Sequence, residues 1–116
     1  MRAVATGLVL LVALLHVYFL VLEMFFWDTP FGRRVFRLTP EFSSASKALA
    51  ANQGLYNGFL AAGLIYGLVS SATPIKILFL VFVVVAGVFG AITVNKRIFW
   101  IQAAPAIAAL ALLGAS

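Results

Sequence analysis

The sequence predicts an all-α integral membrane protein, a four-helix bundle whose four spans form a single transmembrane domain over residues 1–116. Composition is the first observation: 9% of the residues are charged and 65% are apolar, whereas soluble proteins carry about 25% and about 45–50%. The second is that no charged residue occurs in four runs, residues 3–22, 48–75, 77–95 and 98–116. Each run is close to, or longer than, the ~20 residues that cross a ~30 Å hydrocarbon core as a helix.

Apolar length places the four spans at about residues 4–27, 48–69, 75–94 and 98–113. The first is expected to be a retained span, because its apolar run exceeds the roughly 7 to 15 residues of a signal-peptide core. Residues 70–74 join spans two and three, and residues 95–97 join spans three and four. Connections this short predict antiparallel hairpins.

The connection between spans one and two carries two helix start signals. Residues 28–30, Asp-Thr-Pro, predict an N-cap followed by a first-turn proline, which opens a short interfacial helix over residues 31–38. This segment interleaves arginines with aromatic and aliphatic residues, so it is expected to lie along the membrane surface. Residues 39–41, Thr-Pro-Glu, repeat the signal, and the helix that they open is expected to continue into span two.

The basic residues predict the orientation of the spans, because positively charged loops are retained on the cytoplasmic side. One face carries Arg2 and Lys76; the other carries Arg33, Arg34, Arg37, Lys47, Lys96 and Arg97. The first and third loops are therefore predicted to be cytoplasmic, and both termini to lie outside the cytoplasm. The net charge of +5 is explained by this topology, so no nucleic-acid partner is expected.

Two residue types limit the chemistry that is available. The chain has no cysteine and one histidine, which excludes disulfides, thiolate metal sites, cysteine nucleophiles and a multi-histidine metal site within one chain. No metal and no cofactor are expected. Membrane lipid is the expected partner, together with a small hydrophobic ligand.

Polar residues within the spans gather in the cytoplasmic half of the predicted bundle. The candidate ligand-binding residues are Glu23, Asn52, Gln53, Asn57 and Gln102. An ionisable group within a membrane is costly unless it is paired or hydrated, and it usually faces the bundle interior or a water-filled cavity. Glu23 is therefore the sharpest functional candidate; the alternative is that it reaches interfacial water or pairs with Lys96 or Arg97.

His16 and Glu23 are the candidate catalytic residues, since either side chain can move a proton. They are seven residues apart on one helix face, which separates them by about 10 Å along the axis. The alternative for His16 is a neutral imidazole that donates one hydrogen bond to a neighbouring helix. The residues leave open whether any reaction is catalysed.

Small residues recur within the second span at the spacing of one helical turn. Gly54 and Gly58 form a GxxxG step, and Gly63 and Gly67 form a second one. Such steps allow another helix to approach closely. A homodimer seam is one interpretation, and packing within one bundle is the favoured one, because four helices offer many internal contacts. In span four, Pro105 predicts a local kink.

Several of these segments resemble one family. They are HVYFLVLEMFFW at residues 16–27, TPEF at 39–42, LAANQGLYNGFLAA at 49–62 and GVFGAITVNKR at 87–97, followed by Gln102. In this order they resemble the small bacterial four-span membrane proteins grouped as domain of unknown function 1304. The resemblance implies a bacterial inner-membrane location and supplies no reaction.

Three functions from different classes are compatible with these patterns. The first is a cytoplasm-facing intramembrane polar pocket that binds, with or without acid/base processing, a small hydrophobic or amphiphilic molecule. The second is a structural or assembly subunit of a membrane complex, whose polar groups hold helices together. The third is a dimeric proton-coupled exporter; against it, a transport route needs access from both faces, and the predicted outer half is almost wholly apolar.

Overall fold

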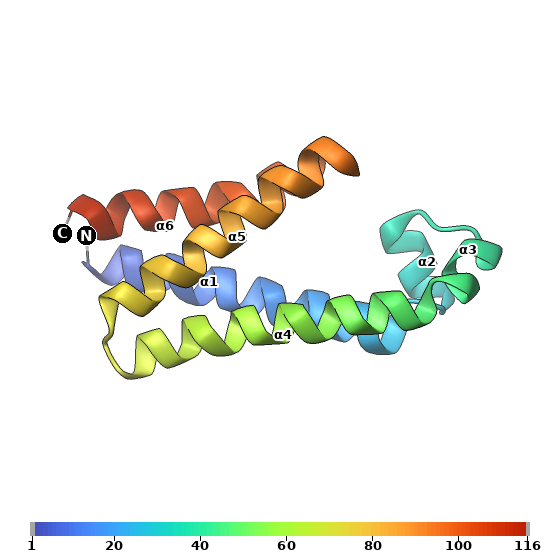
Figure 1. Ribbon diagram of the computed structural model, residues 1–116, viewed down its shortest axis with the longest axis horizontal. Helices are drawn as coiled ribbons and strands as arrows, with labels where there is room; N and C mark the ends of the chain where they lie inside the picture. The colour runs from blue at the N-terminus through green and yellow to red at the C-terminus, as the bar shows by residue number, and fades with distance from the viewer. Residues whose placement is uncertain (1, 116) are drawn as a thin grey trace. The chain divides into compact units, whose positions relative to one another are not determined.

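The computed structural model describes residues 2–115, and every regular element within them is helical, so the all-α prediction is confirmed. Figure 1 shows the elements in chain order. They are α1 (Arg2–Val21), the π-helical segment η1 (Leu22–Phe26), α2 (Pro30–Phe36), α3 (Pro40–Ala45), α4 (Lys47–Val69), α5 (Thr73–Thr93), the π-helical segment η2 (Phe99–Ala103) and α6 (Ala104–Ala115).

The long helices coincide with the predicted apolar segments to within two residues at nearly every end. Two of them, Arg2–Phe26 and Thr73–Thr93, are long and apolar enough to cross a membrane, and Phe99–Ala115 is a shorter apolar helix. Helix α4 is also long, but three carboxamides make it less apolar. By length and hydropathy, two helices therefore qualify as spans, against the four predicted.

The chain divides into two compact units, one formed by residues 2–15 and 60–115 and the other by His16–Phe59. The first unit contains a continuous apolar core to which α1, α4, α5 and α6 all contribute. Its buried members are Val9, Val12, Ala13, Leu64, Leu80, Val83, Ala106 and Ala109. Close approach of backbones supports this packing: a Cβ atom on Gly87 of α5 would lie 2.8 Å from the Cβ of Ala103.

A π-helical segment, η2, lies directly before α6 and close to Pro105, the residue at which a kink was predicted. The backbone N–H of Ala104 donates to the carbonyl of Phe99, five residues earlier. Proline lacks an N–H and cannot complete the usual hydrogen bond to the residue four positions before it. A local π turn is one of the ways in which a helix accommodates such a residue.

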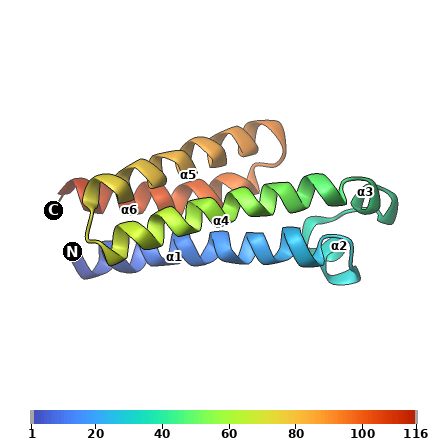
Figure 2. The ribbon, with the colours of Figure 1, turned by 60° about the horizontal axis from the view of Figure 1, so that its bottom comes forward.

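Two capped short helices form most of the connection between α1 and α4 (Figure 2). The Thr29 hydroxyl accepts a hydrogen bond from the Gly32 N–H at 3.2 Å, and Thr39 accepts one from the Phe42 N–H at 3.1 Å. Both threonines precede a first-turn proline, so both predicted start signals are confirmed. Helix α2 begins four residues after the end of η1, and α3 begins four residues after the end of α2.

The ends of these two helices differ from the prediction. Helix α2 stops at Phe36 because Arg37 adopts a left-handed backbone conformation, φ 57°. Helix α3 does not continue into α4: it ends at Ala45, and Ser46, at φ −100° and ψ 6°, separates the two. The connection therefore holds two short helices where one separate helix was predicted.

Candidate functional site

Glu23 and Asn57, two of the predicted ligand-binding residues, are in direct contact. The Nδ2 group of Asn57 donates a hydrogen bond to Oε1 of Glu23 at 2.5 Å. Glu23 belongs to η1 and Asn57 to α4, and both lie in the unit His16–Phe59. Asn57 is buried, with 5% of its surface exposed, and Glu23 is half-buried. The acid that the sequence singles out thus has an amide partner from another helix.

Two glycines of α4 allow this contact. A Cβ atom on Gly54 would lie 2.7 Å from Met24 Cγ and 3.2 Å from Glu23 Cβ. A Cβ atom on Gly58 would lie 2.6 Å from Leu20 Cδ1. The GxxxG step therefore packs against helix surface of the same chain, as the favoured interpretation expects, and the homodimer stays a prediction.

Both Glu23 and Gln102 lie in π-helical segments, η1 and η2 respectively. A π-helical insertion changes the direction in which the following side chains point, and such insertions occur frequently at functional sites. Pro105 is a sequence signal for η2. No proline or glycine falls within η1, Leu22–Phe26, so the local sequence does not predict this π-helical segment.

His16 is fully buried in α1. Its ring meets the ring of Phe19 edge-on, with 5.4 Å between the centroids and an interplanar angle of 71°. Within residues 2–115, no buried side-chain nitrogen or oxygen lacks a hydrogen-bond partner. His16 therefore sits in a packed environment in which its polar atoms are satisfied, and its part in proton transfer stays a prediction.

The remaining predicted site residues are placed differently. Asn52 and Gln53 are exposed on α4. Gln102 is half-buried in η2, in the unit formed by residues 2–15 and 60–115. Of the five predicted ligand-binding residues, the structure brings Glu23 and Asn57 into contact. In the described part of the chain, no group of three or more His, Asp or Glu side chains could hold a metal ion.

A second polar cluster, which the sequence analysis missed, is centred on Asp28. Its Oδ1 atom accepts hydrogen bonds from Nη1 of Arg33 at 3.0 Å and from the Ser43 hydroxyl at 2.7 Å. Nearby, Nε1 of Trp27 donates to Ser46 Oγ at 2.9 Å. The cluster links the end of η1 to both short helices. The spacing of Asp28 and Arg33 could have suggested the ion pair, but nothing local points to Ser43.

A third feature is a pocket of about 630 Å³ whose lining residues all belong to the unit formed by residues 2–15 and 60–115. Its basic residues, Arg2 and Lys76, are the two that lie on the face predicted to be outside the cytoplasm. Because they are 74 positions apart in the chain, their meeting at one pocket has no local sequence signal.

Comparisons with known proteins agree with the resemblance. The sequence model of the family described as "Protein of unknown function (DUF1304)" matches residues 10–114. The curated protein "Uncharacterized protein YpaA" of Lactococcus lactis subsp. lactis (strain IL1403) is 37% identical over 105 residues, which cover 87% of this chain and 88% of that protein. No solved structure matches the chain.

Proposed function

Because the chain belongs to the DUF1304 family, whose description assigns no activity, we propose its function from its own residues. The protein is a four-span protein of the bacterial inner membrane, with both termini outside the cytoplasm. The Glu23–Asn57 pair is the polar centre of an intramembrane site, open toward the cytoplasm, that binds a small hydrophobic or amphiphilic molecule. The hydrogen bond between these two side chains carries the proposal.

The surfaces of α1 and α5, which belong to the two segments long and apolar enough to cross a membrane, support the membrane location. Large apolar side chains are exposed along both of them, among them Leu10, Leu11 and Leu14 on α1 and Phe82, Val85 and Phe89 on α5. Exposure of this kind is unfavourable in water but matches a hydrocarbon environment. The same surfaces would contact acyl chains in a bilayer. The asymmetry of the basic residues supports the orientation.

The chemistry of the pair supports ligand binding. A carboxyl group offers more hydrogen-bonding positions than the single amide donor of Asn57 occupies. Since Glu23 is half-buried, its carboxyl group can be reached by a small molecule as well as by Asn57. A ligand hydroxyl or amine would find there a strong hydrogen-bond acceptor, and an ionisable group within a membrane is a functional-site candidate because it is costly to keep there.

Acid/base processing of the bound molecule would use the same carboxyl group. An amide neither gives nor takes a proton in the accessible range, so Glu23 is the member of the pair that can do so. A ligand held against Glu23 would therefore be placed for proton exchange with it.

A structural or assembly role is the second candidate, and the close packing around the pair favours it. Gly54 brings α4 against the side chains of Met24 and Glu23, and the Asn57 hydrogen bond joins the same two segments. In this role the pair would hold two helices together in a membrane complex and bind no ligand.

The two candidates are separated by the molecules that co-purify with the protein. The wild type, Glu23→Gln, Asn57→Leu and the control Thr93→Val are purified in a neutral detergent, and their extracts are compared by mass spectrometry. Thr93 is a suitable control because its hydroxyl donates only to the backbone carbonyl of Phe89, one turn earlier. Ligand binding predicts a species present in the wild type and control and depleted in both site variants. Identical extracts from all four proteins would exclude the binding role.

A further inference from the structure

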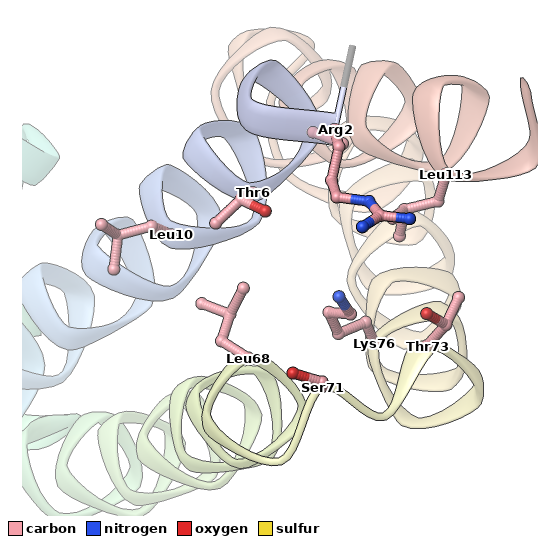
Figure 3. Close-up of a pocket in the computed structure, with 9 residues that line it drawn as sticks. Arg2, Thr6, Leu10, Leu68, Ser71, Thr73, Lys76 and Leu113 are labelled. Carbon is pink, nitrogen blue, oxygen red and sulfur yellow. The ribbon is translucent and has the colours of Figure 1, made fainter. Parts of the chain in front are cut away.

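The pocket of the unit formed by residues 2–15 and 60–115 combines positive charge, hydroxyl groups and apolar surface. Figure 3 shows the guanidinium of Arg2 and the amino group of Lys76 directed into the same opening, with the hydroxyls of Thr6, Ser71 and Thr73 around it. Leu10, Leu68 and Leu113 line the remainder of the wall. The pocket therefore presents two cations and three hydroxyl donors beside an aliphatic surface.

No acidic side chain of this unit can neutralise the two cations. The three acidic residues of the chain are Glu23, Asp28 and Glu41, and all of them lie in the other unit, His16–Phe59. The ion pair found within residues 2–115 joins Arg33 to Asp28, neither of which lines the pocket. Two like charges that face one opening repel each other, so an anion from outside the unit would be favourably bound between them.

Lys76 packs closely against the end of α4. A Cβ atom on Gly67 would lie 2.7 Å from Lys76 Cγ and 3.2 Å from its backbone nitrogen. The missing side chain of Gly67 thus lets the end of α4 lie directly on the stem of Lys76. Since Lys76 is four residues into α5, its charge lies at the helix end where the dipole favours anions over cations. Helix stability therefore does not explain a lysine here.

We propose that this pocket binds the phosphate group of an anionic amphiphile. Arg2 and Lys76 neutralise the phosphate oxygens through charge-assisted hydrogen bonds. The hydroxyls of Thr6, Ser71 and Thr73 donate further hydrogen bonds to the same oxygens. At about 630 Å³ the pocket is larger than a phosphate group needs, and the leucines match the start of an acyl chain. The lipid source of the phosphate rests on the membrane location proposed above.

The direct test compares ligands that share only part of this chemistry. The wild type in a neutral detergent is titrated with phosphatidylglycerol, with uncharged diacylglycerol and with inorganic phosphate, and binding is followed by native mass spectrometry and by the unfolding temperature. Phosphatidylglycerol binding in preference to the other two identifies a lipid headgroup as the ligand. Equal binding of inorganic phosphate supports the same site with a soluble phosphate as its ligand. Equal binding of diacylglycerol overturns the proposal.

Variants separate this site from unspecific attraction of anions. The double change Arg2→Gln with Lys76→Gln is expected to weaken phosphatidylglycerol binding by about tenfold or more. The matched control, Lys96→Gln with Arg97→Gln, removes the same charge from the same unit at residues outside the pocket lining and is expected to leave binding unchanged. Equal affinity in the two double variants would overturn the proposal.

Two further proteins keep the test decisive if the double variant does not fold. Gly67→Ala leaves the net charge unchanged and displaces the Lys76 stem, so it too is expected to weaken phosphatidylglycerol binding, by about threefold or more. Wild-type affinity in a folded Gly67→Ala protein would count against the assigned role of Lys76. Glu23→Gln tests the other site and is expected to leave this affinity unchanged, so failure of one proposal is distinguishable from failure of the other.

Discussion

The Nδ2 group of Asn57 donates a 2.5 Å hydrogen bond to Oε1 of Glu23, which joins residues 34 positions apart. In the membrane location proposed above, a hydrogen bond between helices contributes on average only about 0.6 kcal/mol, with a maximum near 1.7 kcal/mol. Leaving a carboxyl group without a partner in an apolar environment costs more than that. The hydrogen bond therefore stabilises the fold mainly by avoiding this cost. Because the bond itself contributes so little, stability does not explain why an acid is present at position 23, and a functional role does.

Replacement of Asn57 is expected to destabilise the protein more than replacement of Glu23. Asn57→Leu removes the donor and leaves the Glu23 carboxyl group without this partner, at a cost of about 1–3 kcal/mol. Glu23→Gln keeps an acceptor oxygen at the same position and should cost less than about 1 kcal/mol. Equilibrium unfolding in mixed detergent micelles measures both values. The reverse order would mean that the hydrogen bond is not what holds these segments together.

Gly54 and Gly7 are expected to respond oppositely to alanine. At Gly54 the new methyl group would meet Met24 Cγ at 2.7 Å and the backbone carbonyl of Leu20 at 3.2 Å, so α4 must shift, at a cost of about 1–3 kcal/mol. At Gly7 nothing lies within 4 Å, and alanine should stabilise α1 by about 0.5–1 kcal/mol through its helix propensity. The same unfolding assay compares the two variants; equal effects would contradict the close packing at Gly54.

The Asp28 cluster is expected to hold α2 and α3 in place. Asp28→Ala removes the acceptor of both Arg33 and Ser43, whose combined loss should weaken this region by about 1–2 kcal/mol. Hydrogen exchange of the backbone amides of α2 and α3 should accelerate, while α5 stays protected. Glu41→Ala is the control: this acid is exposed in the first turn of α3, so its loss should cost only about 0.3–1 kcal/mol.

The proposed orientation can be tested with single cysteines, because the chain contains none. Ser70→Cys follows α4 at the predicted outer face, and Ser44→Cys lies in α3 at the predicted cytoplasmic face; both serines are exposed. In intact cells, a membrane-impermeant maleimide should label Ser70→Cys only, and Ser44→Cys should react after permeabilisation. The opposite labelling pattern would reverse the orientation and place the phosphate pocket at the inner leaflet.

The long helices and the starts of the two short ones could largely be predicted from local sequence. Apolar length and the absence of charge located the long helices, and the Thr-Pro pairs at residues 29–30 and 39–40 located the starts of α2 and α3. Such signals are readable because hydropathy and capping depend on residues within one or two turns of each other. The break at Ser46 and the π-helical segment η1 were not predicted, since no proline or glycine marks either of them.

The sites depend on which helix faces meet, and local sequence does not contain that information. Polar residues in the predicted spans identified Glu23 and Asn57 as candidates, but their contact requires the face of α4 that carries Gly54 to lie against Met24. Asn52 and Gln53 have similar chemistry, yet the rotation of α4 leaves them exposed. Likewise, Arg2 and Lys76 line one pocket only because the ends of separate helices pack together. Helix rotation is decided by close packing between distant segments, which only the tertiary structure specifies.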